Sequence, residues 1–299
     1  MDTAARHRLA LILLFITPAL WSVNALIARK APGMIEPHQL ALGRWLLASA
    51  LFAWGSHAEI WAQRRQVLVD WKQYLVLGGL GMWICGAWVY IGGRTTSAAN
   101  IGLIYSISPV LIVLASTLWL GERFTLRQAL GVLLALGGVL HVVLKGQWSA
   151  LLSIAFAPGD GWILAATVSW TLYSLLLRRW TSPLGVGAQL AVISLAGALI
   201  NLPFALWETL QATTPAFSLE GGVLALIAAV IPGYAAFLAH SIMQRELGAA
   251  RVSMLLYLAP IYTAAMAWLV LGEPLYGFHV WGMALVLPGI YLVTRKPAS

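Results

Sequence analysis

Two pairs of side chains with the same spacing could hold a flat, partly polar solute. Trp21 and Asn24 lie three residues apart in one apolar stretch, and Trp170 and Tyr173 repeat that spacing in another. Residues three apart share a helix face, and aromatic walls with a few amide and hydroxyl groups suit such a solute. Ordinary helix packing would also explain them. Five further residues are expected to line the same cavity: Tyr90, Asn100, Tyr105, His240 and Tyr257.

Charged side chains are scarce inside the apolar stretches. None of the ten Asp and Glu residues falls deep within one, although buried carboxylates are the usual proton relays and counter-ions in membranes. Their absence disfavours a site for organic cations and favours a neutral or zwitterionic solute. Arg44 does lie inside a stretch, at a cost of roughly 2.5–3.5 kcal/mol. It reaches the membrane surface, pairs with a structural partner, or binds a carboxylate of the solute. His240 either bonds the solute or is a structural histidine.

Motifs for catalysis, metals or cofactors are missing from the sequence. Cys85 is the single cysteine, so an internal disulfide and a thiolate metal site are both excluded. There is no phosphate-binding glycine loop of an ATP-driven pump, no zinc-type spacing of His and Glu, and no nucleophile elbow. We therefore expect no catalytic residue, no metal and no cofactor. A membrane-embedded enzyme acting on lipids would need a cluster of His, Asp or Glu at one interface, and none is visible.

Two prolines interrupt long apolar stretches at Pro109 and Pro260. Proline removes a backbone hydrogen bond and clashes with the preceding turn, so we expect both helices to kink. Because the two prolines correspond in an internal repeat, they are candidates for a pair of bending gates. Proline is also common in membrane helices without any such role.

Gly-Glu pairs end the same two stretches, at Gly121 and Glu122 and again at Gly272 and Glu273. Glycine adopts the left-handed conformation that ends a helix. The glutamate then lies near the start of the next helix, where the helix dipole favours negative charge. We interpret both pairs as structural; a role in proton coupling is the alternative.

The composition is that of an integral membrane protein. Of 299 residues, 61% are hydrophobic and 9% charged, with a mean hydropathy of +0.84. Soluble domains have roughly 45–50% apolar and about 25% charged residues, and a globule of this length could not bury the excess. This excludes a soluble enzyme, a disordered protein and, despite the net charge of +8, a nucleic-acid binder.

Ten apolar stretches are long enough to cross a bilayer, which needs about 20 residues. The longest polar connections, around 57–72 and 208–220, are expected as loops. Most of the 18 Lys and Arg residues fall on the side of the N-terminus, so both termini are expected in the cytoplasm. The predicted spans are residues 9–28, 39–57, 73–92, 98–120, 127–145, 161–178, 185–207, 221–242, 250–271 and 277–294.

The chain contains an internal repeat. A shift of 151 positions places Pro109 on Pro260, and it superimposes both Gly-Glu pairs as well as two further glycines of each half. A shift of 149 places Trp21 on Trp170. Each half, residues 1–147 and 158–299, carries five predicted spans. Because five is odd, the second copy enters the membrane from the opposite side, as in the inverted repeats of many secondary transporters.

The two proline segments resemble a known family. Ser108-Pro109-Val110 through Leu120-Gly121-Glu122-Arg123, and Ala259-Pro260 through Leu271-Gly272-Glu273-Pro274, are similar to the EamA-type repeat of the drug/metabolite transporter superfamily. The resemblance covers essentially the whole chain. It implies a central cavity lined by spans 1, 3, 4, 6, 8 and 9, with spans 5 and 10 packing outside it. Similar members export amino acids or other small metabolites from bacteria, and the tryptophan-rich layout most resembles an exporter of aromatic amino acids.

We therefore expect an all-helical protein of ten transmembrane helices, arranged as two inverted five-helix repeats around a central cavity. It would be a secondary transporter of the bacterial cytoplasmic membrane that works as a monomer and exports small metabolites, aromatic amino acids first, by alternating access. Its partners would be the solute and the lipid bilayer, with no nucleic acid. Broad multidrug efflux through the same architecture is the alternative, but it would need a buried anion.

The inverted repeat predicts the sidedness of the two Gly-Glu pairs. Labelling of the Gly121-Glu122 and Gly272-Glu273 segments with a membrane-impermeant reagent should place them on opposite faces of the membrane. Finding both on one face would contradict the inverted arrangement.

Overall fold

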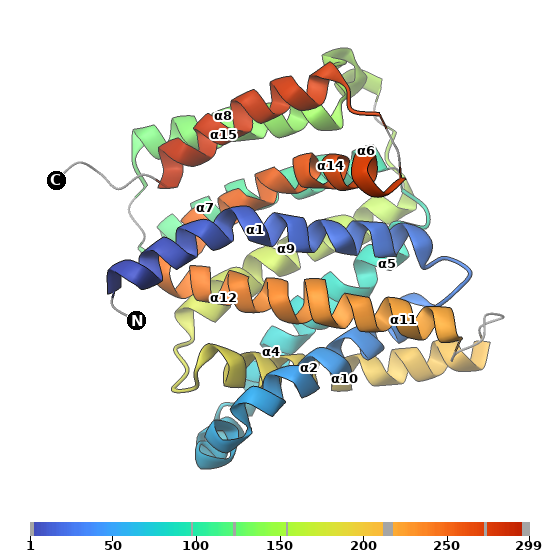
Figure 1. Ribbon diagram of the computed structural model, residues 1–299, viewed down its shortest axis with the longest axis vertical. Helices are drawn as coiled ribbons and strands as arrows, with labels where there is room; N and C mark the ends of the chain where they lie inside the picture. The colour runs from blue at the N-terminus through green and yellow to red at the C-terminus, as the bar shows by residue number, and fades with distance from the viewer. Residues whose placement is uncertain are drawn as a thin grey trace.

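The computed structural model describes residues 3–96, 98–121, 124–153, 155–211, 218–271 and 274–294. This part of the chain is an all-helical bundle without strands (Figure 1). Its α-helices are α1 Thr3–Lys30, α2 Pro37–Ala62, α3 Arg64–Val69, α4 Trp71–Gly78, α5 Val89–Gly92, α6 Ala98–Ser106, α7 Ser108–Leu120, α8 Leu126–Val143, α9 Pro158–Arg179, α10 Val186–Gln211, α11 Leu219–Ala228, α12 Ala236–Leu247, α13 Ala249–Ser253, α14 Ala259–Leu271 and α15 Gly277–Thr294. The other helical segments are η1 Gly79–Trp88, η2 Trp148–Ser153, η3 Ala229–Ala235 and η4 Met254–Leu258.

The membrane-crossing elements are helical rods, several of which join helices end to end. Eight of them in the described residues are long and apolar enough to span a bilayer. The remaining two, α2 and α9, contain 26 and 22 residues, which exceeds the about 20 needed, but they carry more polar side chains. All ten occupy predicted positions. In Figure 1 the start of α1 and the end of α15 lie at the same end of the bundle, as an even number of membrane crossings requires.

The connection expected over residues 57–72 is largely helical, which corrects that prediction. Helix α2 continues to Ala62, and α3 follows over Arg64–Val69. No glycine or proline occurs in this stretch, so nothing in the sequence stops the helix at its polar residues.

The rods form layers with α8 and α15 along one side of the bundle and α2 and α10 along the other (Figure 1). Between them lie α1, α7, α9, α12 and α14. The outer place of α8 and α15 agrees with the expectation that spans 5 and 10 pack outside the centre.

Glycines allow α8 and α15 to cross at very short range. A β-carbon added to Gly131 would lie 2.6 Å from the carbonyl oxygen of Gly289, and one added to Gly138 would lie 2.7 Å from that of Gly282. Early residues of one helix therefore meet late residues of the other, so the helices are antiparallel. The repeat shift places Gly131 on Gly282 and Gly138 on Gly289. Equivalent helices thus run in opposite directions, as an inverted repeat demands.

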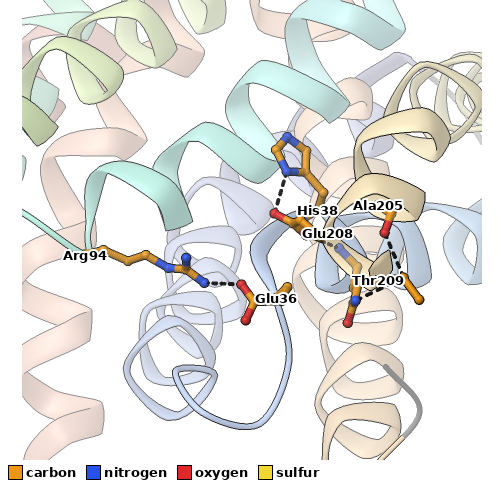
Figure 2. Close-up of polar contacts among 7 residues, drawn as sticks. Glu36, His38, Arg94, Ala205, Glu208 and Thr209 are labelled. Atoms are coloured by element: carbon orange, nitrogen blue, oxygen red, sulfur yellow. Dashed lines mark hydrogen bonds and ion pairs between the residues drawn. The ribbon is translucent and has the colours of Figure 1, made fainter. Parts of the chain in front are cut away.

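A second symmetric contact ties α2 to α10 at both ends. The carboxylate of Glu208 accepts hydrogen bonds from the backbone N–H groups of His38 (2.8 Å) and Gln39 (3.2 Å) at the start of α2. Figure 2 shows its second oxygen against the His38 ring, 2.7 Å away. Glu59 accepts in the same way from the N–H of Gly185, just before α10. The two glutamates differ by 149 positions, so each repeat caps the other's helix.

Equivalent arginines support these ends. Arg94 donates to Glu36 at 2.6 Å, just ahead of α2 (Figure 2). Its repeat equivalent Arg245 donates to the carbonyl of Leu184 (3.0 Å) and to the side chain of Gln189 (2.7 Å) at the start of α10. Repeat-equivalent arginines therefore support the starts of both α2 and α10, through different acceptors.

Both prolines coincide with breaks in their rods. Helix α6 ends at Ser106, one residue before α7 begins with Pro109 in its first turn. In the second repeat the short α13 gives way to the 3₁₀ segment η4, and α14 begins beside Pro260. These interruptions follow from the backbone donor that proline lacks.

The first Gly-Glu motif closes α7 as expected. Gly121 has φ +67° and ends the helix in the left-handed conformation. Glu122, Gly272 and Glu273 lie outside the described residues.

Two π-helical segments were not predicted from the sequence. The segments η1 and η3 lie in the third and eighth membrane spans. Their first residues, Gly79 and Ala229, correspond within one position under the shift of 151. π-helical turns displace backbone carbonyls from the regular ladder and are frequent at functional sites.

The α8–α15 crossing predicts a sharp difference between neighbouring glycines. Gly138→Ala forces a methyl group against the carbonyl of Gly282 and should lower the free energy of unfolding by about 1–3 kcal/mol. Gly137→Ala is the matched control, because a β-carbon there meets nothing within 4 Å, and alanine favours helix by ~1 kcal/mol. Thermal unfolding in detergent measures both. Equal behaviour of the two variants would contradict the close crossing.

Candidate functional site

The predicted tryptophans meet at the centre of the bundle. Trp21 of α1 and Trp170 of α9 are in edge contact, with ring centroids 5.4 Å apart. His240 of α12 lies 5.5 Å from the first ring and 5.1 Å from the second, and Phe237 lies 6.1 and 5.8 Å from them. Tyr173 stacks on Trp170 at 5.4 Å. We call these five residues the aromatic cluster.

Two polar atoms of the aromatic cluster are buried without a hydrogen-bond partner among the described residues. Tyr173 is fully buried and His240 is 3% exposed. Neither the Tyr173 hydroxyl nor His240 Nδ1 has a hydrogen-bond partner within the described part of the chain. Buried polar groups are normally paired, so these two unpaired atoms make the aromatic cluster a candidate binding site.

A polar group adjoins the aromatic cluster. Asn24 Oδ1 accepts hydrogen bonds from the Tyr90 hydroxyl (2.6 Å) and from Arg44 Nη1 (3.1 Å). Arg44 Nη2 donates to the carbonyl of Pro232 at 3.1 Å, within the π-helical segment η3. We call Asn24, Arg44 and Tyr90 the polar group. It joins α1, α2 and α5 to η3.

Arg44 links the polar group to the aromatic cluster. Its guanidinium carbon lies 4.5 Å from the ring centroid of Trp45 and 5.9 Å from that of Phe237. The residue is only 4% exposed, so it does not reach the membrane surface. Binding of a solute carboxylate is one of the three alternatives that the sequence leaves open for Arg44, which is not counted among the predicted cavity residues. Phe237 was missed altogether, although it lies three residues before His240 on the same helix face.

The structure does not bring Asn100 to this site. Its amide donates to Asp160 Oδ2 (2.8 Å) and to the carbonyl of Ala155 (3.0 Å). Asp160 lies ten residues before Trp170 on α9, about 15 Å along the axis. Asn100 therefore supports the start of α9, together with Thr96, which also donates to Asp160.

The remaining predicted residues lie on neighbouring rods. Tyr257 is fully buried in η4, in a hydrophobic cluster against which Trp21 packs, and its hydroxyl has no partner among the described residues. Tyr105 is half-buried on α6. Their place in a cavity stays a prediction, as does gating at Pro109 and Pro260. In the described residues, no three His, Cys, Asp or Glu side chains gather as a metal site.

The sequence belongs to the EamA-like transporter family. The family's sequence model matches twice, over residues 8–144 and 157–295. The uncharacterized transporter YyaM of Bacillus subtilis is 27% identical over 88% of this chain and 86% of its own length. A probable terminal-alkyne amino-acid exporter of Streptantibioticus cattleyicolor is 26% identical over 78% of this chain and 76% of its own length.

A solved crystal structure shares the fold. It superposes with a TM-score of 0.75 at 22% identity, over 95% of this chain and 97% of the other. At that identity the likeness concerns the fold alone. The family and its relatives make this chain a membrane transporter built from two EamA repeats.

The aromatic cluster predicts which tryptophans matter. Trp170→Ala removes ring contacts worth about 0.5–1.5 kcal/mol each and should lower solute uptake into proteoliposomes roughly tenfold. Trp61→Ala is the control, since Trp61 is 71% exposed at the end of α2, and it should leave uptake unchanged. Equal losses in the two variants would contradict the central site.

Proposed function

We propose that this transporter exports small organic metabolites, and aromatic amino acids first among them. The observation that carries the proposal is the contact between the aromatic cluster and the polar group at the meeting of the two repeats. Rings from α1, α9 and α12 can stack on a flat apolar body. Asn24, Arg44 and Tyr90 supply amide, cationic and hydroxyl groups for its polar end. The amino-acid exporter of Streptantibioticus cattleyicolor lends support as a relative.

Alternating access would use the two broken rods. The breaks beside Pro109 and Pro260 leave backbone groups outside the regular ladder, so these points bend at low cost. The rod that contains Pro109 and the rod that contains Pro260 run in opposite directions. Helix α7 of the first repeat contacts α13 of the second. Bending of one rod would open the site to one face of the membrane while the other rod keeps the second face closed.

Transport of the solute would not be coupled to a proton gradient. No Asp or Glu lies deep within a predicted span, and such residues are the usual proton relays of transporters. We therefore favour facilitated diffusion down the solute gradient over proton exchange. The protein would act as a monomer in the bacterial cytoplasmic membrane with both termini in the cytoplasm, as the distribution of Lys and Arg supports.

Reconstitution into liposomes tests the proposal. Uptake is measured for a labelled panel of amino acids, nucleosides and quaternary amines, each with and without a pH gradient. We expect aromatic amino acids to be carried fastest and uptake to be independent of the gradient. Preference for quaternary amines would instead indicate multidrug efflux, and a strict need for the gradient would overturn facilitated diffusion. Empty liposomes provide the background rate.

A further inference from the structure

We propose that Arg44 is the group that binds a carboxylate of the transported solute. The inference rests on the proposed function, because it assigns the solute's anionic end to a residue of the same site. It also narrows the substrate class to solutes with a carboxylate next to a flat apolar body.

The charge of Arg44 has only neutral partners. Its hydrogen bonds go to the side-chain oxygen of Asn24 and the carbonyl of Pro232. The ion pairs found among the described residues, His38 with Glu208 and Arg94 with Glu36, lie elsewhere. Buried cations in membrane proteins pair with anions or with backbone carbonyls, and they mark substrate paths.

The guanidinium keeps donors for a ligand. It carries five N–H groups, and its two hydrogen bonds to the described residues use two of them. Its Nε is buried and has no partner in the described chain. Asn24 uses its side-chain oxygen in its contacts with Arg44 and Tyr90. The planar fork of arginine suits the two oxygens of a carboxylate.

The position fits a solute held among the rings. Phe237 is in contact with Trp21 and Trp170, and its ring centroid also lies 5.9 Å from the guanidinium carbon of Arg44. An apolar ring placed in the aromatic cluster therefore has Arg44 beside it, within reach of a short carboxylate-bearing chain.

The internal repeat carries no charge at the position equivalent to Arg44. At the positions equivalent to Asn24, Arg44 and Tyr90, the second half carries Tyr173, Ile193 and Ser241. Ile193 is fully buried within the packed pair of α2 and α10. The same helix position thus packs with an aliphatic side chain in one repeat, and the cationic one is a specialisation of the other.

Ligand-induced thermal stabilisation of the purified transporter tests the assignment. The probes are phenylalanine, 3-phenylpropionate and 3-phenylpropanamide, of which the last two differ only in the carboxylate. The wild type should bind 3-phenylpropionate at least tenfold more tightly than the amide. Arg44→Gln should bind the acid and the amide about equally, because it removes the cation but keeps a polar side chain. Arg64→Gln, which alters an exposed arginine stacked on Trp61, should keep the full preference.

Asn24→Asp supplies a second variant that preserves the arginine. Its new carboxylate would pair with Arg44 and with the Tyr90 hydroxyl in place of the amide oxygen. We expect a melting temperature at or above that of the wild type, together with a loss of at least tenfold in binding of 3-phenylpropionate that exceeds any loss for the amide. This variant decides the matter if Arg44→Gln fails to fold.

The outcomes separate this inference from the proposed function. Equal binding of acid and amide by the wild type, or a preserved preference in Arg44→Gln or Asn24→Asp, overturns the role of Arg44 even if phenylalanine is transported. Preference for 3-phenylpropionate that depends on Arg44, without uptake of any aromatic amino acid, supports the role of Arg44 and overturns the proposed amino-acid substrate.

Discussion

The structure depends on the packing of two equivalent halves that run through the membrane in opposite directions. Equivalent helices then meet near a common axis, and equivalent residues can touch. The glycines of α8 and α15 contact one another's backbones. Glu59 of α2 caps the start of α10, and Glu208 of α10 caps the start of α2. These contacts hold the outer layers, which leaves the helices between them to form the site.

Irregular backbone is concentrated around that site. The π-helical segments η1 and η3 and the breaks beside Pro109 and Pro260 lie in rods that surround it. In a bilayer every backbone polar group needs a partner, so irregular backbone persists only where protein or solute supplies one. The carbonyl of Pro232 illustrates this, since Arg44 donates to it. Irregular helices therefore give the centre polarity that side chains alone would not.

The two halves differ at the position of Arg44. The tryptophans Trp21 and Trp170 are symmetric and form the shared part of the site. Arg44 has an aliphatic equivalent, Ile193, so its charge has no counterpart at the equivalent position of the second repeat. A symmetric scaffold can be entered from either face of the membrane. The aromatic cluster on one side and the polar group on the other can orient a solute that has one apolar and one polar end.

The sequence by itself determined the membrane environment, the helical class, the repeat and the central tryptophans. Apolar runs of fixed length, prolines and glycines in one register, and a helix spacing of three are local patterns that survive in any packing. Only the tertiary structure decided that Asn100 serves the start of α9, that Phe237 belongs to the aromatic cluster, and that Arg44 is buried against neutral partners. These outcomes depend on which faces of distant helices meet, and an apolar span looks much the same on every face until its neighbours are in place.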